Sequence, residues 1–287
     1  MESTKPHWLT KPLPYGEHLI EVGRVLSRLK LHTVCQSALC PNMGECFSRK
    51  TATFMIMGNI CTRNCYFCAV DKGTPKPLET DEPARIARAA EDLKLLHIVV
   101  TSVTRDDLSD GGANHFAQTI AAVREINQNA TVEVLIPDFC GSREAIEVVV
   151  DAEPDIINHN LETIPRLYSK VRPKADYLRS LDILKQVKEL DGGIFTKSGI
   201  MLGLGEEEEE ILTVMKDLCQ IDCDFFTLGQ YLSPSQDHLP VARYIPPEEF
   251  EYLASKGKEM GFHGIASGPF VRSSYRADEL LREGKEI

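Results

Sequence analysis

A tight group of cysteines, Cys61, Cys65 and Cys68, constrains this chain more than any other feature. The three follow an apolar run over residues 53–58 that predicts a β-strand, so they lie on a strand-end loop at C-x3-C-x2-C spacing. Three thiolates in so short a loop can hold three irons of a cubane. A closed [4Fe-4S] site takes four cysteines, so here one iron stays open to a ligand from outside the protein.

The open iron indicates what this loop binds. The amino and carboxylate groups of S-adenosylmethionine (SAM) can chelate it. An electron passed from the cluster to the sulfonium then breaks a C–S bond and produces a 5′-deoxyadenosyl radical, which takes hydrogen from an unactivated carbon. Zinc is the alternative, but zinc usually takes two separated ligand pairs in a closed tetrahedron. The spacing and the strand-then-loop placement favour the open cluster.

A second cysteine triplet, Cys35, Cys40 and Cys46, lies just upstream, with Pro41 and Gly44 suited to a loop that curls around an inorganic core. Six thiolates exceed what one site can use, so two triplets predict two clusters. Sharing of ligands between the triplets, around a single cluster or a zinc ion, stays open as the alternative. No fourth cysteine lies near the second triplet.

The other three cysteines, Cys140, Cys219 and Cys223, lie far along the chain in apolar helical or strand patterns. We expect them to be buried small hydrophobic residues rather than ligands. A disulfide framework is not expected in a chain of 287 residues, because disulfides persist in oxidising compartments and staple much smaller domains. Cysteine in this chain therefore indicates metal binding or catalysis.

Charge and hydropathy narrow the possible partners. The net charge of −11 argues against nucleic acid, because phosphate binding requires a basic face. No apolar stretch approaches the roughly 20 residues that a membrane span requires, and the first residues lack the apolar core of a signal peptide. We therefore expect a cytoplasmic protein that acts on small molecules or protein partners.

From about residue 80, short β-branched runs alternate with longer amphipathic stretches such as 82–95 and 177–190, which predict helices. With 53–58, the predicted strands are 97–103, 132–137, 155–162, 196–204 and 225–232. Six strand–helix units predict a partial TIM-like (β/α)6 barrel, with a doubly wound open sheet as the alternative. We divide the chain into an N-terminal extension (1–50), the barrel (51–262) and a C-terminal extension (263–287).

Five further segments accompany the two triplets: Asn158-His159-Asn160-Leu161-Glu162, Thr196-Lys197-Ser198-Gly199, Gly203-Leu204-Gly205-Glu206, Thr227-Leu228-Gly229-Gln230-Tyr231-Leu232 and Arg272-Ser273-Ser274-Tyr275. Together with the triplets, they make the chain resemble the lipoyl synthase family, which belongs to the radical SAM enzymes. The resemblance covers nearly the whole chain, and the pairing of both triplets with a terminal Arg-Ser-Ser-Tyr distinguishes this family from its relatives.

The resemblance implies a reaction. Two sulfur atoms are inserted at C6 and C8 of an octanoyl chain that is amide-linked to a lysine of a carrier protein. Two SAM molecules are consumed, and an electron donor is a further partner. The family's carriers are the lipoyl domains of 2-oxoacid dehydrogenases and the glycine-cleavage H protein. The resemblance also implies that the Cys35, Cys40 and Cys46 cluster is the sulfur source and is dismantled during turnover. A serine of the terminal motif is its fourth ligand, which we assign to Ser274 with Ser273 as the fallback.

Asn160 and Glu162 follow a predicted strand, where barrel enzymes place ligand-binding groups. We expect them to contact SAM, with a satisfied hydrogen-bonding turn as the alternative. Two other functions stay open. One is a different radical sulfur-inserting enzyme, similar to biotin synthase and acting on a small free molecule. The other is a non-catalytic iron-sulfur electron carrier or scaffold, although an open-site cluster on a body of this size exceeds what electron transfer requires.

Overall fold

The computed structural model describes residues 5–11, 17–38, 40–49 and 51–285. In this part of the chain, eight strands form one sheet in the order β1-β2-β5-β6-β7-β8-β9-β10, and all neighbours are parallel except β1 and β2. A second sheet pairs β3 with β4. The strands are β1 His32–Thr33, β2 Ala52–Ile56, β3 Ile60–Cys61, β4 Asp71–Lys72, β5 His97–Ser102, β6 Thr131–Leu135, β7 Ile156–Asn158, β8 Phe195–Leu202, β9 Phe225–Gln230 and β10 Gly264–Gly268.

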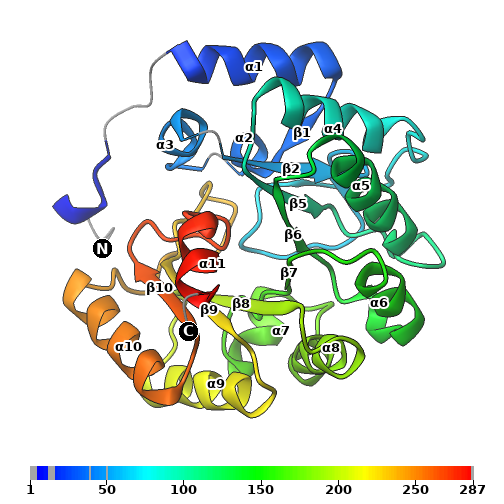
Figure 1. Ribbon diagram of the computed structural model, residues 1–287. Coiled ribbons are helices and arrows are strands. Elements are labelled where there is room, and N and C mark those ends of the chain that lie inside the picture. Colours follow the sequence, from blue (N-terminus) through cyan, green and yellow to red (C-terminus); the bar gives the residue numbers. More distant parts are fainter. Residues whose placement is uncertain (1–4, 12–16, 39, 50, 286–287) are drawn as a thin grey trace.

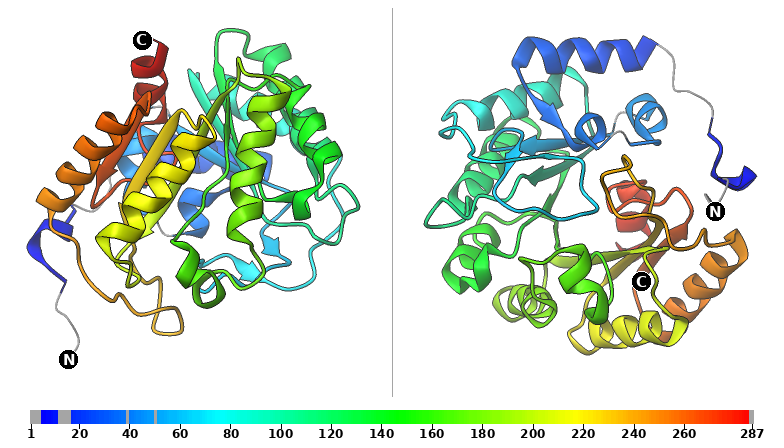
Figure 2. Two further views of the ribbon diagram at one scale, coloured as in Figure 1. Left: turned by 90° about the horizontal axis from the view of Figure 1, so that it is seen from below. Right: turned by 180° about the vertical axis from the view of Figure 1, so that it is seen from behind.

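The helices that connect the parallel strands lie outside the curved sheet (Figures 1 and 2). Those that follow the parallel strands are α4 Glu82–Asp92, α5 Ala113–Ile126, α6 Arg143–Val150, α8 Tyr177–Leu190, α9 Glu208–Gln220 and α10 Pro247–Met260. The N-terminal and C-terminal helices are α1 Glu17–Leu29, α2 Val34–Ser37, α3 Met43–Ser48 and α11 Ala277–Lys285. Short pieces are η1 His7–Leu9, η2 Phe139–Gly141, η3 Pro165–Leu167 and α7 Tyr168–Val171.

This architecture confirms the partial (β/α)6 barrel. Six parallel strands from β2 to β9 are each followed by a helix on the outer side, so the doubly wound alternative, which needs helices on both faces, does not fit. β10 then adds a seventh parallel strand beside β9. The sheet order ends at β1 and β10, which leaves the barrel open between them.

Burial explains why the strands read as continuous apolar runs. Every residue of β2 and of β9 is buried, as expected for parallel strands that are covered on both faces. At the amino ends of the strands, Leu280 and Leu281 of α11 pack with Phe225 and Ile156. The C-terminal helix therefore runs back along β10 and covers that end of the barrel (Figure 1).

A charged network lies inside the barrel. Lys197 on β8 donates to both carboxylate oxygens of Glu133 on β6, at 3.0 and 3.1 Å, and both side chains are fully buried. His97 lies 3.4 Å from the same carboxylate, and Asn158 donates to it at 3.3 Å. Burial alone would raise the pKa of Glu133, but Lys197 and His97 outweigh it and lower that pKa to about 2. The carboxylate is therefore ionised and paired.

Removing the ammonium of this pair is expected to destabilise the fold. Lys197→Met leaves Glu133 charged and buried without its main partner, which should lower the free energy of unfolding by about 3–5 kcal/mol. The double variant Lys197→Met/Glu133→Gln should recover part of this loss, because no unpaired charge remains. Denaturant unfolding of the three proteins measures both effects, and equal stability of all three would contradict the account.

Among the residues that the structure describes, no helix combines the length and the apolar character needed to cross a membrane.

Candidate active site

The first cysteine triplet lies on the loop that follows β2, at the carboxyl end of the barrel strands, where barrel enzymes build their sites. Gly58, with φ of 86°, turns the chain away from the strand in a conformation that favours glycine. Burial, together with the neighbouring Cys65 and Cys61, raises the pKa of the Cys68 thiol to about 11. The three thiols are thus close enough to interact electrostatically.

In the described residues, no three cysteine, histidine or acidic side chains converge closely enough to hold a single metal ion.

An arginine inside the first triplet anchors the loop to the barrel. Arg63 is 6% exposed and donates to both oxygens of Asp106 at 2.8 Å and to Asp138 at 2.6 Å. Asp138 is fully buried and also lies 3.3 Å from Arg179 of α8. Burial would raise the pKa of Asp138, but Arg63 outweighs it and lowers that pKa to about 2. The cluster loop is therefore tied to the loops that follow β5 and β6.

We expect Asp138→Asn to impair the first triplet without removing any ligand. Arg63 would keep only Asp106 as an ionic partner, so the loop that carries the cysteines would lose part of its orientation. Loss of such a supporting contact typically costs about 10- to 100-fold in metal affinity or activity. SAM cleavage per chain, measured as 5′-deoxyadenosine, should fall by that amount.

The matched control for this prediction is Asp155→Asn. Asp155 also pairs with an arginine, Arg124, at 2.8 Å, but it lies before β7 at the amino end of the barrel. SAM cleavage per folded chain should stay at the wild-type value in this variant. Equal losses in the Asp138 and Asp155 variants would show that the effect is one of general stability.

The segment between β9 and α10 also contacts this loop. The Leu239 amide donates to the Tyr66 carbonyl at 3.3 Å, and His238 Nε2 lies 3.2 Å from the Cys68 carbonyl oxygen. The Tyr66 amide in turn donates to the Val171 carbonyl at 2.9 Å. Two segments of the chain, at residues 238–239 and at Val171, thus fix the backbone between Cys65 and Cys68.

The second cysteine triplet spans two short helices beside β1 and β2. Cys35 is on α2, whose first turn is capped by Thr33, and Cys46 is on α3. Burial raises the pKa of Cys35 to about 11, with Cys40 adding to the shift. Burial likewise raises the pKa of Cys46 to about 12, with Cys35 and Cys40 adding to it. These three thiols also lie close enough to affect one another.

The terminal Arg-Ser-Ser-Tyr motif packs against the second triplet, although more than 220 residues separate them. The guanidinium of Arg272 lies near enough to Cys40 for their charges to interact. The segment crosses β9 at Gly229, where an added Cβ would lie 2.2 Å from the Val271 carbonyl oxygen. Only glycine allows this close approach. Ser273 and Ser274 are half-buried in the turn before α11.

Asn160 and Glu162 occupy the turn after β7. Glu162 has φ of 65°, and its backbone pairs with β8 through the Gly199 carbonyl and the Met201 amide. Burial raises the pKa of the Glu162 carboxyl, with Arg172 opposing the shift. The Glu162 charge reaches Cys65 and Cys68 of the first triplet.

The Asn160 amide links two parts of the site. Its Nδ2 donates to Glu162 Oε1 at 3.2 Å and to Ser273 Oγ at 3.3 Å. Its Oδ1 is buried without a hydrogen-bond partner among the described residues. A buried acceptor left unpaired is costly, so this oxygen is available to a donor from a bound ligand. The neighbouring His159 is buried, which lowers its pKa to about 4 and leaves it neutral.

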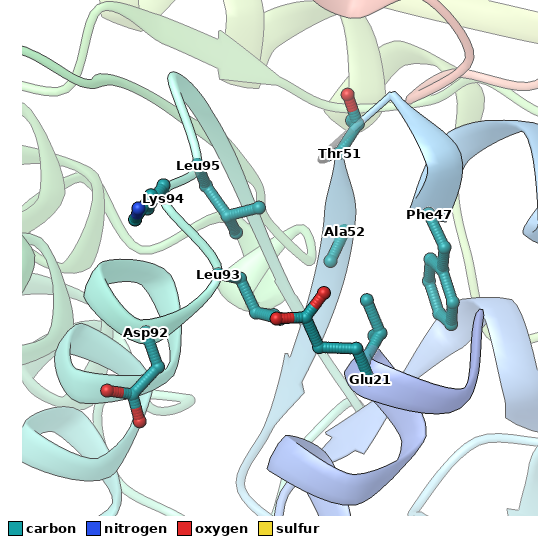
Figure 3. A pocket seen from close by; sticks show the side chains of 9 residues that line it. Glu21, Phe47, Thr51, Ala52, Asp92, Leu93, Lys94 and Leu95 are labelled. Carbon is teal, nitrogen blue, oxygen red and sulfur yellow. The ribbon is translucent and has the colours of Figure 1, made fainter. Parts of the chain in front are cut away.

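A cavity of about 250 Å³ lies elsewhere, at the amino ends of β2 and β5 and therefore away from both the first triplet and Asn160 (Figure 3). Its lining residues are Glu21, Val22, Phe47, Thr51, Ala52, Asp92, Leu93, Lys94 and Leu95.

Comparison with known proteins identifies the family. The Radical SAM superfamily model matches residues 55–218. The lipoyl synthase of Caldanaerobacter subterraneus subsp. tengcongensis is 62% identical over 97% of this chain and 97% of its own length. That of Caldicellulosiruptor saccharolyticus is 54% identical over 98% of this chain and 99% of its own length. The chain belongs to the lipoyl synthase family.

Solved structures support the fold. HydG, a maturase of the [FeFe]-hydrogenase, is 16% identical with a TM-score of 0.61, covering 86% of this chain and 62% of that one. Streptococcus suis SuiB bound to S-adenosylmethionine is 13% identical with a TM-score of 0.59, covering 86% and 59%. Both share the barrel shape of this chain, which agrees with the fold described above.

Family membership confirms the enzyme class and the cofactors predicted from the sequence. The chain is a radical SAM sulfurtransferase that uses SAM and [4Fe-4S] clusters, one of them auxiliary. The residues present fit this set. Two groups of interacting thiols can hold two clusters. The unpaired Asn160 Oδ1 offers an acceptor on a side chain that also bonds Glu162, whose charge reaches the first group.

The structure corrects one expectation about the remaining cysteines. Cys223 is buried as expected and Cys219 is half-buried, but Cys140 is exposed and lies on η2 rather than in a helix or strand core. Its Sγ donates to Asp106 Oδ1 at 3.4 Å. The apolar neighbours of Cys140 in sequence are misleading, because Phe139 turns inward while the left-handed backbone at Cys140, with φ of 53°, turns the thiol outward.

Proposed function

We propose that the two cysteine triplets divide the work of sulfur insertion. Cys61, Cys65 and Cys68 hold the cluster that binds SAM, and the other triplet, with Ser274, holds the auxiliary cluster. When bound, the first cluster supplies the electron that cleaves SAM, and the auxiliary cluster supplies sulfur for C6 and C8 of a protein-bound octanoyl-lysine. The main support is that the Asn160 side chain joins the two regions. It donates to Glu162, whose charge reaches the first triplet, and to Ser273 of the motif that packs against the second triplet.

Asn160 and Glu162 are proposed to bind SAM. Glu162 is a half-buried carboxyl beside Cys65 and Arg172, well placed to accept hydrogen bonds from the amino group or the ribose of the ligand. The unpaired Asn160 Oδ1 would accept another. Arg172 donates to the Asn160 carbonyl at 2.7 Å and fixes this turn before the ligand arrives.

The two terminal serines are expected to differ in their effects. Ser273 Oγ already accepts a hydrogen bond from Asn160, which leaves Ser274 as the better candidate for the auxiliary cluster. An Fe–O bond is harder and more labile than Fe–S, which suits a cluster that is dismantled. We expect Ser274→Ala to reduce sulfur insertion at least about 10-fold, because loss of a ligand should cost no less than loss of a supporting contact, while Ser273→Ala has a smaller effect.

Mass spectrometry of an octanoyl-lysine peptide after reaction measures these losses. SAM cleavage in the same samples should be retained in Ser274→Ala, because the first triplet is unchanged. If Ser273→Ala is the more damaging variant, the ligand is Ser273, and full sulfur insertion by both variants would remove serine ligation altogether.

The proposed substrates are octanoylated carrier proteins, namely the lipoyl domains of 2-oxoacid dehydrogenases and the glycine-cleavage H protein, with a separate electron donor. A cytoplasmic location fits nine cysteines that are all free. We also propose the division into residues 1–50, 51–262 and 263–287, in which the two extensions supply the auxiliary ligands and the central part supplies the SAM site.

Iron analysis tests whether the triplets hold separate clusters. Alanine is placed at all three cysteines of one triplet, and iron per folded chain is measured after anaerobic reconstitution. Separate clusters predict that each triple variant keeps about half of the wild-type iron, because a four-iron cluster remains. Loss of all iron in both variants would favour the shared-cluster alternative.

A further inference from the structure

The segment between Cys40 and Cys46, which includes the start of α3, contacts the C-terminal segment at two separate points. Asn42 Nδ2 donates to the Phe270 carbonyl at 2.6 Å. Glu45 Oε1 accepts from the Tyr275 hydroxyl at 2.8 Å. These contacts lie before and after residues 271–274, so that short stretch is fixed at both ends.

Arg276 adds a third contact to the same carboxylate. Its Nη2 lies 3.1 Å from Glu45 Oε1, and its guanidinium also lies over the Tyr275 ring at 5.4 Å. Tyr275 and Arg276 come directly after Ser274 in the chain. Consecutive Cα atoms are about 3.8 Å apart, so fixing Tyr275 leaves Ser274 little freedom to move.

Lys11 connects the two contact points. Its ammonium donates to Asn42 Oδ1 at 2.6 Å and to Glu45 Oε2 at 2.9 Å. It also lies over the rings of Phe270 and Tyr275, at 5.1 and 5.2 Å from their centroids. Lys11 from the N-terminal part of the chain and Tyr275 and Arg276 from the C-terminal part therefore meet at the Glu45 carboxylate.

We propose that Glu45 is a positioning residue that holds Ser274 within reach of the auxiliary cluster, an inference that rests on the proposed function. Glu45 is 29% exposed and accepts from Lys11 with one oxygen and from Tyr275 and Arg276 with the other. A carboxylate with three donors from two distant segments aligns those segments more firmly than a single hydrogen bond does. Supporting contacts of this kind orient the ligands of metal sites.

Iron release from the holoenzyme tests this role. Wild-type protein and Glu45→Gln, each reconstituted with both clusters, are mixed anaerobically with an iron chelator, and released iron is followed by absorbance. Iron released from the auxiliary cluster is identified as the component of the release curve that is missing in Cys46→Ala. We expect that component to be about 10- to 100-fold faster in Glu45→Gln, with SAM cleavage unchanged. Auxiliary release at the wild-type rate would overturn the proposal.

A double variant shows whether Glu45 acts through the serine. If it does, Ser274→Ala/Glu45→Gln should release auxiliary iron no faster than Ser274→Ala alone, because the contact that Glu45 supports is already absent. Effects that multiply would mean that Glu45 acts on the site independently, which also overturns the proposal. Ser274→Ala measured alone tests whether Ser274 is a cluster ligand. Failure of the ligand assignment is therefore distinguished from failure of the positioning role of Glu45.

Glu189→Gln is the matched control. Glu189 is an exposed carboxylate that pairs with Arg143 at 3.2 Å and with Lys185 at 3.7 Å, on α8 and remote in sequence from both triplets. It should release iron at the wild-type rate. Thermal unfolding of each variant without clusters is measured in parallel. A positioning role requires that Glu45→Gln release auxiliary iron faster than Glu189→Gln even where the two variants unfold at the same temperature.

Discussion

Alanine at Cys61, Cys65 and Cys68 is expected to abolish SAM cleavage and sulfur insertion together. Without these thiolates the first cluster has no protein ligands, so no electron reaches the sulfonium and no radical forms. The auxiliary triplet remains, and the protein should still bind about half of the wild-type iron. The measurement is 5′-deoxyadenosine formed per chain under strong reductant, compared with the background without protein.

The matched control is Cys219→Ala, which removes a half-buried thiol from α9. It should retain both SAM cleavage and sulfur insertion, which would show that loss of a cysteine is not damaging in itself. Continued formation of 5′-deoxyadenosine by the triple variant, at a rate above background, would contradict the assignment of the first triplet.

Alanine at Cys46 is expected to separate the two activities. The first triplet and its anchor through Arg63 are unchanged, so SAM should still be cleaved. Sulfur insertion should be lost completely, because the auxiliary cluster that supplies the sulfur lacks a ligand. Octanoyl-lysine peptide from this reaction should carry no added sulfur, while 5′-deoxyadenosine accumulates.

Two other results for Cys46→Ala would contradict this account. Full sulfur insertion would mean that the second triplet is not the sulfur source. Loss of SAM cleavage together with sulfur insertion would instead favour ligand sharing between the triplets around one cluster. Thermal unfolding of the same preparation distinguishes this second result from simple failure to fold.

The barrel could be predicted from the sequence because its signals are local. Helix α8 matches the predicted range 177–190, since Asp176 caps its first turn by accepting from the Arg179 amide. Two boundaries were less accurate. The helix predicted over 82–95 ends at Asp92, because the chain takes a left-handed turn at Lys94, with φ of 53°. The strand predicted over 155–162 ends at Asn158, before the left-handed turn at Glu162.

The cysteine spacing likewise indicates the chemistry, because the three thiols of each triplet lie within a few residues of one another along the chain. The supporting contacts could not be predicted in this way, because they join residues that are distant in sequence. Arg63 looks like an ordinary polar residue within the first triplet, and only the fold brings Asp138 to it. Glu45 lies one residue before Cys46, but its partners Lys11 and Tyr275 come from opposite ends of the chain.

Sulfur insertion into a protein-bound octanoyl group is the reaction assigned to this chain. The most direct test is anaerobic incubation of the reconstituted protein with strong reductant, SAM and an octanoyl-lysine peptide, followed by mass spectrometry without reduction during workup. We expect the peptide to gain two sulfur atoms and lose two hydrogen atoms. Cleavage of SAM with an unchanged peptide would contradict the substrate assignment, and absence of both changes despite intact clusters would contradict the radical mechanism itself.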